Sequence, residues 1–271
     1  MPELPEVEVC RLGISPHIIK QQVSKVVVRN ASLRWPIPEE VQTIKGQQVL
    51  SVGRRSKYLL LRFNTGTLLL HLGMSGTIRV IESGVPVAKH DHFDVAFSHG
   101  KVLRLNDPRR FGAVLWLENH EDAQGLLTRL GPEPLSDDFN EGYLFEKAKN
   151  RKVPIKTFLM NNQVVVGVGN IYANEALFKA KILPTAKAGE ISEQRYNALT
   201  YIIKDVLSAA IKQGGTTLKD FTQADGKPGY FAQSLMVYGR AGKPCIECKA
   251  NLLEIRQSNR SSVYCPSCQL P

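Results

Sequence analysis

The feature that most constrains the fold is a series of short apolar segments in the first half of the chain. Eight such segments, rich in Val, Leu, Ile and Phe, lie at residues 25–28, 49–52, 58–63, 68–72, 78–81, 93–97, 102–105 and 114–117. Short segments at this spacing are typical of a β-sandwich or a β-barrel. Glycine-containing turns at 64–67 and 98–101 separate neighbouring segments and indicate hairpins. We therefore predict antiparallel strands that follow one another along the chain.

The pattern changes at residues 131–138, where a proline-rich and acidic stretch ends the strand series. A long helix is predicted to begin after Ser192, a residue type that caps helices, and to end at Gly214–Gly215. Its apolar residues recur at steps of three and four, which indicates one buried face. Shorter helices are predicted at 155–160 and 175–180, with a glycine-containing turn between them.

The chain is basic, and this narrows the class of partner. Its 35 Lys and Arg exceed its 25 Asp and Glu, which gives a formal net charge of +10. A charge of this size attracts polyanions, and nucleic acid is the partner that it favours. A solvated basic surface and an anionic membrane surface are the alternatives.

Membrane insertion and export are not expected. Uninterrupted apolar runs such as 68–70 and 164–166 are far shorter than the roughly 18 residues needed to cross a bilayer. The first six residues also lack the basic start of a signal peptide. We expect a soluble protein of the cytoplasm.

Four cysteines near the end of the chain form two Cys-x-x-Cys pairs. Cys245 and Cys248 are separated by sixteen residues from Cys265 and Cys268, a spacing expected of a four-cysteine zinc site. Four thiolates leave no open coordination position, so we predict one structural Zn²⁺ rather than a catalytic one. Two disulfides are the alternative. The turn at 258–261 between the pairs predicts a basic hairpin with Arg260 at its tip, suited to a phosphate backbone.

The N-terminus carries a possible nucleophile. If Met1 is removed, Pro2 becomes a free secondary amine that can attack an electrophilic sugar carbon and form an iminium ion. Glu3 and Glu6 can both face this amine if a helix begins here. The alternative is that the stretch is only the start of a helix, in which Pro5 is tolerated.

Several of these motifs together resemble the bacterial formamidopyrimidine-DNA glycosylase family. They occur in the family's order over essentially the whole chain, at 1–8, 57–58, 71–76, 89–92, 107–112, 131–135, 166–172 and the four cysteines. Leu4 stands where the sister endonuclease VIII family usually has glycine. The sequence from Glu8 to Leu12 departs from the family's usual Glu-Thr-x-Arg-Arg and lacks one hydroxyl and one charge.

The resemblance implies a base-excision-repair enzyme for double-stranded DNA. The family removes oxidised purines, chiefly 8-oxoguanine opposite cytosine and formamidopyrimidines, and then cuts the strand by β- and δ-elimination. By this resemblance Pro2 is the nucleophile that forms a Schiff base, and Glu3 is the general acid and base. Lys57 would donate a proton in elimination and contact a phosphate, and Arg260 would act in the δ step.

The resemblance also implies a set of DNA contacts. An enzyme that flips a base must fill the space in the stack, and Met74, Arg109 and Phe111 match the family's wedge. The glycines beside Met74 and Phe111 predict exposed loop tips. The other implied DNA contacts are His90, Arg151 (where lysine is common), Lys156 and Asn170. The loop at 216–231 matches the one that covers the flipped base, and we expect it to be disordered without lesion DNA.

The implied fold is an α+β multidomain protein. It has an N-terminal antiparallel β-sandwich domain led by a helix (1–132), a linker (133–150), a helix-two-turns-helix domain (151–238) and a β-hairpin zinc finger (239–271), with DNA bound between the domains. We expect a monomer. A non-catalytic damage-binding module and a glycosylase for oxidised pyrimidines are the rival functions.

Overall fold

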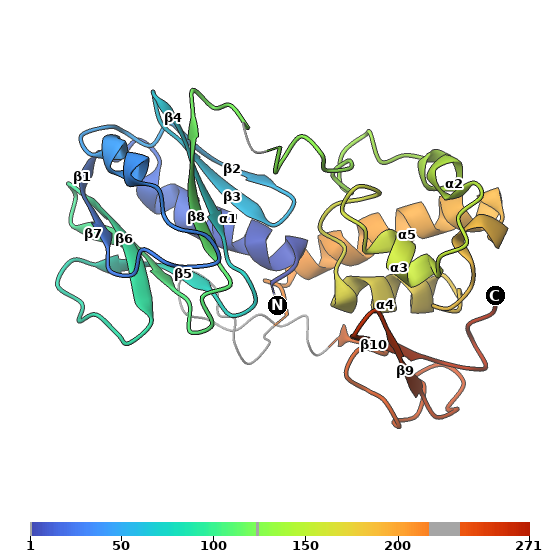
Figure 1. The fold of residues 1–271 in the computed structure, drawn as a ribbon. Coiled ribbons are helices and arrows are strands. Elements are labelled where there is room, and N and C mark those ends of the chain that lie inside the picture. The colour runs from blue at the N-terminus through green and yellow to red at the C-terminus, as the bar shows by residue number, and fades with distance from the viewer. Residues whose placement is uncertain (1, 123–124, 217–233) are drawn as a thin grey trace. The chain divides into compact units, whose positions relative to one another are not determined.

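The computed structural model describes residues 2–122, 125–216 and 234–271. The chain divides into two compact units (Figure 1), one formed by 1–128 with 213–232 and the other by 129–212 with 233–271. Residues 217–231 of the predicted covering loop lie outside the described residues. No described helix is long and apolar enough to span a membrane.

Helix α1 (Leu4–Ile18) opens the first unit and lies against strands of both of its sheets. Val7, Cys10, Ile14 and Ile18 are all at most 1% exposed. They recur every three or four residues, so they lie on one face of the helix and bury it in the core. The start of α1 is therefore fixed by the packing of the rest of the helix.

The first unit is a sandwich of two four-stranded antiparallel sheets, which excludes the barrel. One sheet has the order β1-β6-β7-β5 and the other the order β2-β3-β4-β8. The strands are β1 (Val23–Val28), β2 (Ser51–Arg55), β3 (Tyr58–Arg62), β4 (Gly66–His71), β5 (Thr77–Glu82), β6 (Asp91–Phe97), β7 (Lys101–Asn106) and β8 (Ala113–Glu118), with a 3-10 turn η1 (Glu39–Ile44). All eight predicted strands and both predicted hairpins are confirmed.

The pairing order differs from the prediction that strands simply follow one another. Strand β1 pairs with β6, and β8 pairs with β4, so long connections cross between the sheets. The hydrophobic pattern could not reveal this, because every strand with a buried face satisfies it equally well.

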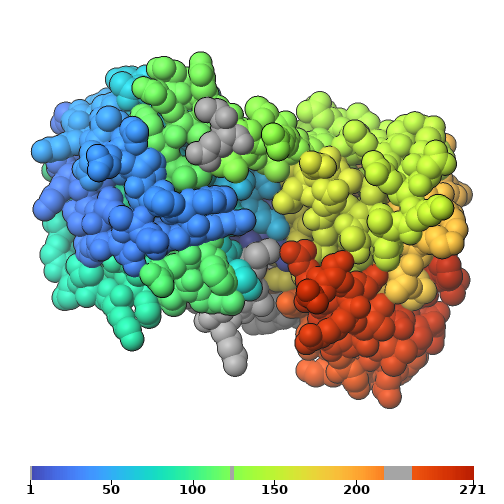
Figure 2. Space-filling view, in the orientation of Figure 1, coloured from blue at the N-terminus to red at the C-terminus, as the bar shows by residue number. Residues whose placement is uncertain are grey.

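The second unit is helical and ends in a hairpin. Its elements are α2 (Tyr143–Ala148), α3 (Ile155–Leu159), α4 (Asn170–Lys179), η2 (Ala188–Glu190), α5 (Glu193–Lys212), β9 (Leu253–Gln257) and β10 (Arg260–Tyr264). In the space-filling view the C-terminal residues, in red, pack as one lobe (Figure 2).

Helix α5 follows the prediction closely. The Ser192 hydroxyl accepts a hydrogen bond from the backbone N–H of Arg195 at 3.4 Å, and Gly214 and Gly215 follow the helix with φ of 77° and 76°. Its predicted stripe, from Tyr196 to Ala210, is buried.

Helix α4 begins at Asn170, five residues before the start predicted at Glu175. All eight residues from Ile171 to Phe178 are buried. A helix buried on every side has no amphipathic period, so its first turns resembled a loop in the sequence. Asn170 consequently lies in the first turn of a helix and not in the preceding turn.

The packing of the sandwich core predicts that alanine substitutions at two leucines have very different effects on the free energy of unfolding. Leu61 on β3 is 0% exposed, whereas Leu50 is 50% exposed. We expect Leu61→Ala to lower the free energy of unfolding by about 2–5 kcal/mol, because it removes buried contacts and leaves a cavity. The matched Leu50→Ala change should stay within about 0.5 kcal/mol. Urea unfolding measures both, and equal losses would contradict this description of the core.

Candidate active site

Pro2 and Glu3 lie at the head of α1. Both are buried, and Glu3 is the residue that caps the helix. The backbone N–H of Glu3 donates to Oε2 of Glu6 at 2.8 Å. The first turn is therefore held by its own side chain as well as by the packing of α1.

Glu6 also joins the first turn to a distant part of the same unit. Its Oε1 accepts hydrogen bonds from the backbone N–H of Thr216 at 3.0 Å and from the Thr216 hydroxyl at 2.9 Å. Glu6 is 0% exposed. The sequence allowed both carboxylates to face the Pro2 amine if a helix begins here. In the structure these contacts make Glu6 an anchor for the backbone around residues 3 and 216.

Lys57 lies in the turn between β2 and β3. The preceding Ser56 has a φ of 54°, and its carbonyl accepts a hydrogen bond from Arg54 Nη1 at 2.8 Å. Arg54 also donates through Nε to Oε2 of Glu8 on α1 at 2.9 Å. This bridge ties the turn that carries Lys57 to the helix that carries Pro2.

His71 lies at the end of β4, close to the loop that carries Met74, and the sequence analysis gave it no role. Its ring centre lies 4.9 Å from that of Tyr58, and its Nδ1 accepts the backbone N–H of Gly73 at 3.1 Å. Burial, together with the positive charges of Lys57 and Arg34, lowers the pKa of His71 to about 4. The imidazole is therefore neutral near pH 7. Its place directly before the Gly73-Met74 turn was the signal that could have identified it.

The three predicted wedge residues lie on two exposed loops. Met74 is 38% exposed on the loop between β4 and β5, and Phe111 is 45% exposed on the loop between β7 and β8. Arg109 stacks on Phe111, with its guanidinium carbon 4.9 Å from the ring centre. The prediction of exposed loop tips is confirmed for Met74 and Phe111.

A buried ion cluster supports the loop that carries His90. Arg104 donates to both carboxylate oxygens of Asp94 at 2.9 Å, and its Nη1 donates to the carbonyls of Val85 and Pro86 at 3.2 and 3.1 Å. Burial raises the pKa of Asp94, but hydrogen bonds from Arg29 and Arg104 outweigh it and hold that pKa below its usual value. His90, at the end of this loop, is partly exposed.

Lys156, in the second unit, is buried and not exposed to a DNA ligand. It is 1% exposed, and its Nζ donates to the Ser261 carbonyl at 2.6 Å and to the Ser262 hydroxyl at 2.7 Å. The prediction of a direct DNA contact is therefore corrected. The ammonium group fixes α3 to β10, which begins with Arg260.

Helix α4 holds the C-terminal segment through two further buried polar residues. Asn174 Oδ1 accepts the backbone N–H of Val263 at 2.8 Å. Glu175 accepts the backbone N–H groups of residues 236, 237 and 238 at 2.8–3.0 Å. Burial raises the pKa of Glu175 even though these hydrogen bonds oppose the rise.

Asn170 and Arg151 occupy different settings in the same unit. The side-chain oxygen of Asn170 is buried and has no hydrogen-bond partner in the part of the chain that the structure describes. Arg151 is exposed and lines a pocket of about 410 Å³ together with Arg260. The turn of the β9-β10 hairpin is Ser258-Asn259, with φ of 49° and 60°, so Arg260 lies beside the tip as predicted.

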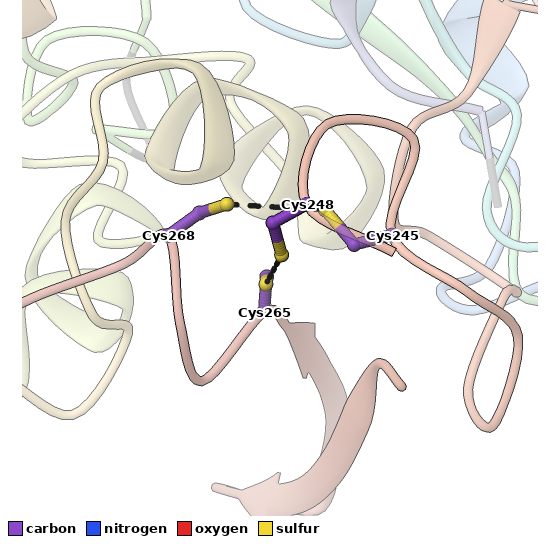
Figure 3. Close-up of side chains that lie close together, drawn as sticks. All are labelled: Cys245, Cys248, Cys265 and Cys268. Atoms are coloured by element: carbon purple, nitrogen blue, oxygen red, sulfur yellow. Dashed lines mark hydrogen bonds between the residues drawn. The ribbon is translucent and has the colours of Figure 1, made fainter. Parts of the chain in front are cut away.

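The four predicted zinc ligands meet in one place. Figure 3 shows the side chains of Cys245, Cys248, Cys265 and Cys268 pointing toward one another. Their sulfur atoms all lie within 4.8 Å of each other. Tetrahedral ligation at about 2.3 Å requires sulfur atoms about 3.8 Å apart, so the set fits a metal ion. The four cysteines are free, and the sulfur atoms of Cys248 and Cys265 lie 3.3 Å apart, well beyond the length of a disulfide bond.

Comparison with known proteins gives matches over both units. A family model described as the formamidopyrimidine-DNA glycosylase N-terminal domain matches residues 1–114, and one described as the H2TH domain of the same glycosylase matches residues 130–222. The formamidopyrimidine-DNA glycosylase of Colwellia psychrerythraea is 80% identical over 269 residues, which are 99% of each chain.

Solved structures of Lactococcus lactis Fpg are similar over 100% of both chains at 30% identity. A variant in complex with DNA that contains Fapy-dG has a TM-score of 0.91. The wild-type protein in complex with DNA that contains an oxidised pyrimidine has a TM-score of 0.89. These similarities confirm the α+β fold with its sandwich, helical domain and cysteine-bearing hairpin.

The lowered pKa of His71 predicts a specific dependence of stability on pH. Its pKa is about 4 in the folded chain against an ordinary value of 6.5. Between these values the unfolded chain takes up a proton that the folded chain does not. The free energy of unfolding should therefore fall by up to about 3 kcal/mol as the pH drops through this window.

Urea unfolding between pH 7 and pH 4 tests this. His71→Asn should remove that part of the pH dependence, whereas a change at the exposed His99 should keep it. A wild-type curve that does not differ from that of His71→Asn would show that the ring is not held neutral.

Proposed function

The chain belongs to the formamidopyrimidine-DNA glycosylase family, and on that premise we propose that Pro2, Glu3, Lys57 and Arg260 carry its chemistry. It is a base-excision-repair enzyme, a bifunctional DNA glycosylase and AP lyase that removes oxidised purines from DNA. The observation that carries this function is the 80% identity to a formamidopyrimidine-DNA glycosylase over 99% of both chains. The intact Pro2 and Glu3 argue against a non-catalytic damage-binding module.

In the proposed glycosylase step the Pro2 nitrogen forms a bond to C1′ of the damaged nucleotide, and the bond from C1′ to the base breaks. The base leaves with the electron pair of that bond and takes up the proton that the Pro2 nitrogen loses. The sugar ring then opens, its oxygen takes a proton from Glu3, and the nitrogen and C1′ remain joined as a Schiff base. The position of Pro2 at the N-terminus of α1 supports this role. The positive end of the helix dipole disfavours a protonated amine and so favours the nucleophilic form.

In the proposed lyase steps the Schiff base acidifies neighbouring C–H bonds, and the two phosphate groups leave in turn. Lys57 donates a proton in elimination and contacts a phosphate, and Arg260 acts in the δ step. The products are a one-nucleoside gap with phosphate at both ends. The location of Lys57 in a fixed turn and of Arg260 beside a hairpin tip supports these assignments.

For DNA binding we propose that Met74, Arg109 and Phe111 enter the stack when the lesion is extruded. Met74 and Phe111 supply apolar surface, and Arg109 pairs with the orphaned cytosine. His90, Arg151 and Asn170 are proposed to contact the DNA. The net charge of +10 supports binding of duplex DNA. We propose in addition that the chain acts as a monomer in the cytoplasm.

We also propose that the four cysteines hold one structural Zn²⁺. Zinc bound to four thiolates supplies no open position for water, so its contribution is to the folding of the hairpin. The domain assignment that accompanies this proposal is a catalytic domain at 1–132, a linker at 133–150, a helix-two-turns-helix domain at 151–238 and a zinc finger at 239–271.

Oxidised pyrimidines are a second candidate substrate class. The Lactococcus lactis relative has been solved in complex with DNA that contains an oxidised pyrimidine. This complex favours oxidised pyrimidines as a second substrate class. Excision of 8-oxoguanine and of an oxidised pyrimidine, measured side by side in otherwise identical duplexes, ranks the two classes.

The proposed nucleophile predicts a covalent adduct at one residue. Borohydride added during reaction with 8-oxoguanine DNA should reduce the Schiff base and trap the enzyme on the strand, and mass spectrometry should locate the link at Pro2. A protein that keeps an extra residue before Pro2 serves as control and should not be trapped. Trapping on an internal lysine would refute the Pro2 mechanism.

The proposed zinc site predicts a metal-dependent hairpin. The purified protein should contain one zinc per chain, and Cys245→Ala should lose the metal and bind lesion DNA at least about tenfold more weakly, because the hairpin loses its order. Cys10→Ala is the matched control, since Cys10 is the one cysteine of the chain outside the cluster, buried in the sandwich core. Normal DNA affinity of Cys245→Ala would count against a structural zinc.

A further inference from the structure

Asp107 carries a buried carboxylate to which the proposed mechanism gives no task. It follows β7 directly and is 0% exposed. Among the described residues it has no ion-pair partner, and its side chain accepts hydrogen bonds only from uncharged donors. Burial of a carboxylate without an opposite charge lowers the stability of the fold. Such a group is typical of a position where it holds neighbouring groups in a particular geometry.

The hydrogen bonds of Asp107 join three loops of the first unit. Oδ1 accepts from the Ser75 hydroxyl at 3.1 Å, and Oδ2 accepts from the backbone N–H of Gly112 at 2.7 Å. The backbone N–H of Asp107 donates to the His90 carbonyl at 2.9 Å. Each bond ends beside a residue proposed to contact DNA, because Ser75 follows Met74, Gly112 follows Phe111, and the third partner is His90 itself.

Two glycines bring these loops into direct backbone contact. A Cβ added to Gly73 would lie 2.4 Å from the carbonyl carbon of Phe111, and Gly73 has a φ of +62°. A Cβ on Gly112 would lie 2.7 Å from the His71 carbonyl and 2.9 Å from Asp107 Oδ2. No side chain separates the two loops at these points, so a shift of one loop displaces the other.

We propose that Asp107 is a positioning residue that holds Met74, Arg109 and Phe111 as one rigid wedge. This inference rests on the proposed function of those three residues. Both apolar side chains of the wedge are more than a third exposed, so burial does not fix them. Hydrogen bonds from the Ser75 hydroxyl and the Gly112 backbone N–H to Asp107 supply the rigidity that a base-flipping wedge requires.

The test compares two substrates in single-turnover reactions of Asp107→Asn. Asparagine has the same shape but no negative charge, and its amide nitrogen can only donate. The bond from Gly112 then ends on a neutral oxygen and the Ser75 hydroxyl must turn to accept, so both loop bonds are weakened. Excision of 8-oxoguanine opposite cytosine requires extrusion of a stacked base, whereas strand cleavage at a preformed abasic site does not. We expect the first rate to fall about tenfold more than the second, a size typical of misplaced positioning groups.

Hydrogen exchange gives a readout that does not depend on activity. In Asp107→Asn the amides of residues 109–112 should exchange faster than in the wild type. The control is Val95→Ala, which removes methyl groups from a core residue that is 0% exposed and should lower stability without changing either the exchange of this loop or the ratio of the two rates. An Asp107→Asn protein that matches Val95→Ala in both readouts overturns the proposal.

A double variant, Met74→Ala with Phe111→Ala, distinguishes failure of the positioning role of Asp107 from failure of the proposed wedge. If the double variant lowers the rate ratio and Asp107→Asn does not, the wedge assignment stands and the positioning role is wrong. If neither changes the ratio, the wedge assignment itself fails and the positioning role fails with it. Should Asp107→Asn not fold, Ser75→Ala removes one loop bond alone, and an unchanged ratio in that variant overturns the proposal.

Discussion

The burial of one face of α1 in the sandwich core is the constraint on which the proposed chemistry depends. An amine at a chain end would ordinarily move freely, because terminal residues are seldom held. Here the helix that follows Pro2 packs against strands of both sheets, and the buried Glu6 fixes the first turn to residues 3 and 216. The proposed nucleophile therefore gains its position from the apolar packing of α1 and from the hydrogen bonds of Glu6.

The second unit is organised by buried polar groups as much as by apolar ones. Lys156, Asn174 and Glu175 are each 1% exposed, and each makes hydrogen bonds to the C-terminal segment. A hairpin of two five-residue strands is marginal by itself. Hydrogen bonds from α3 and α4, together with the cysteine cluster, supply the support that its own strands lack.

The sequence allowed prediction of the elements but not of their arrangement. Short apolar segments located all eight sandwich strands, including strands such as β4 and β6 that are buried on both faces, and the helical period located α5. The pairing of β1 with β6 could not be predicted, because long connections decide which strands pair. The early start of α4 could not be predicted either, because this helix is buried on all sides and has no amphipathic pattern. Lys156 was misjudged for a related reason: a lysine is read as exposed unless its hydrogen-bond partners, 105 and 106 residues away, are known.

The same reasoning explains why the contacts of Asp107 and His71 could not be predicted from the sequence. Both side chains accept hydrogen bonds from backbone N–H groups of loops. Almost every residue type has such a group, so the sequence does not reveal these contacts. Met74 and Phe111 could be recognised only by resemblance, because two exposed apolar side chains are unremarkable on any surface. Their significance comes from the groups that hold them out, namely the Gly73 amide bound by His71 and the Gly112 amide bound by Asp107. A wedge is useful only if it keeps its shape while it displaces a stacked base, so the supporting polar groups belong to the functional site as much as the side chains that they position.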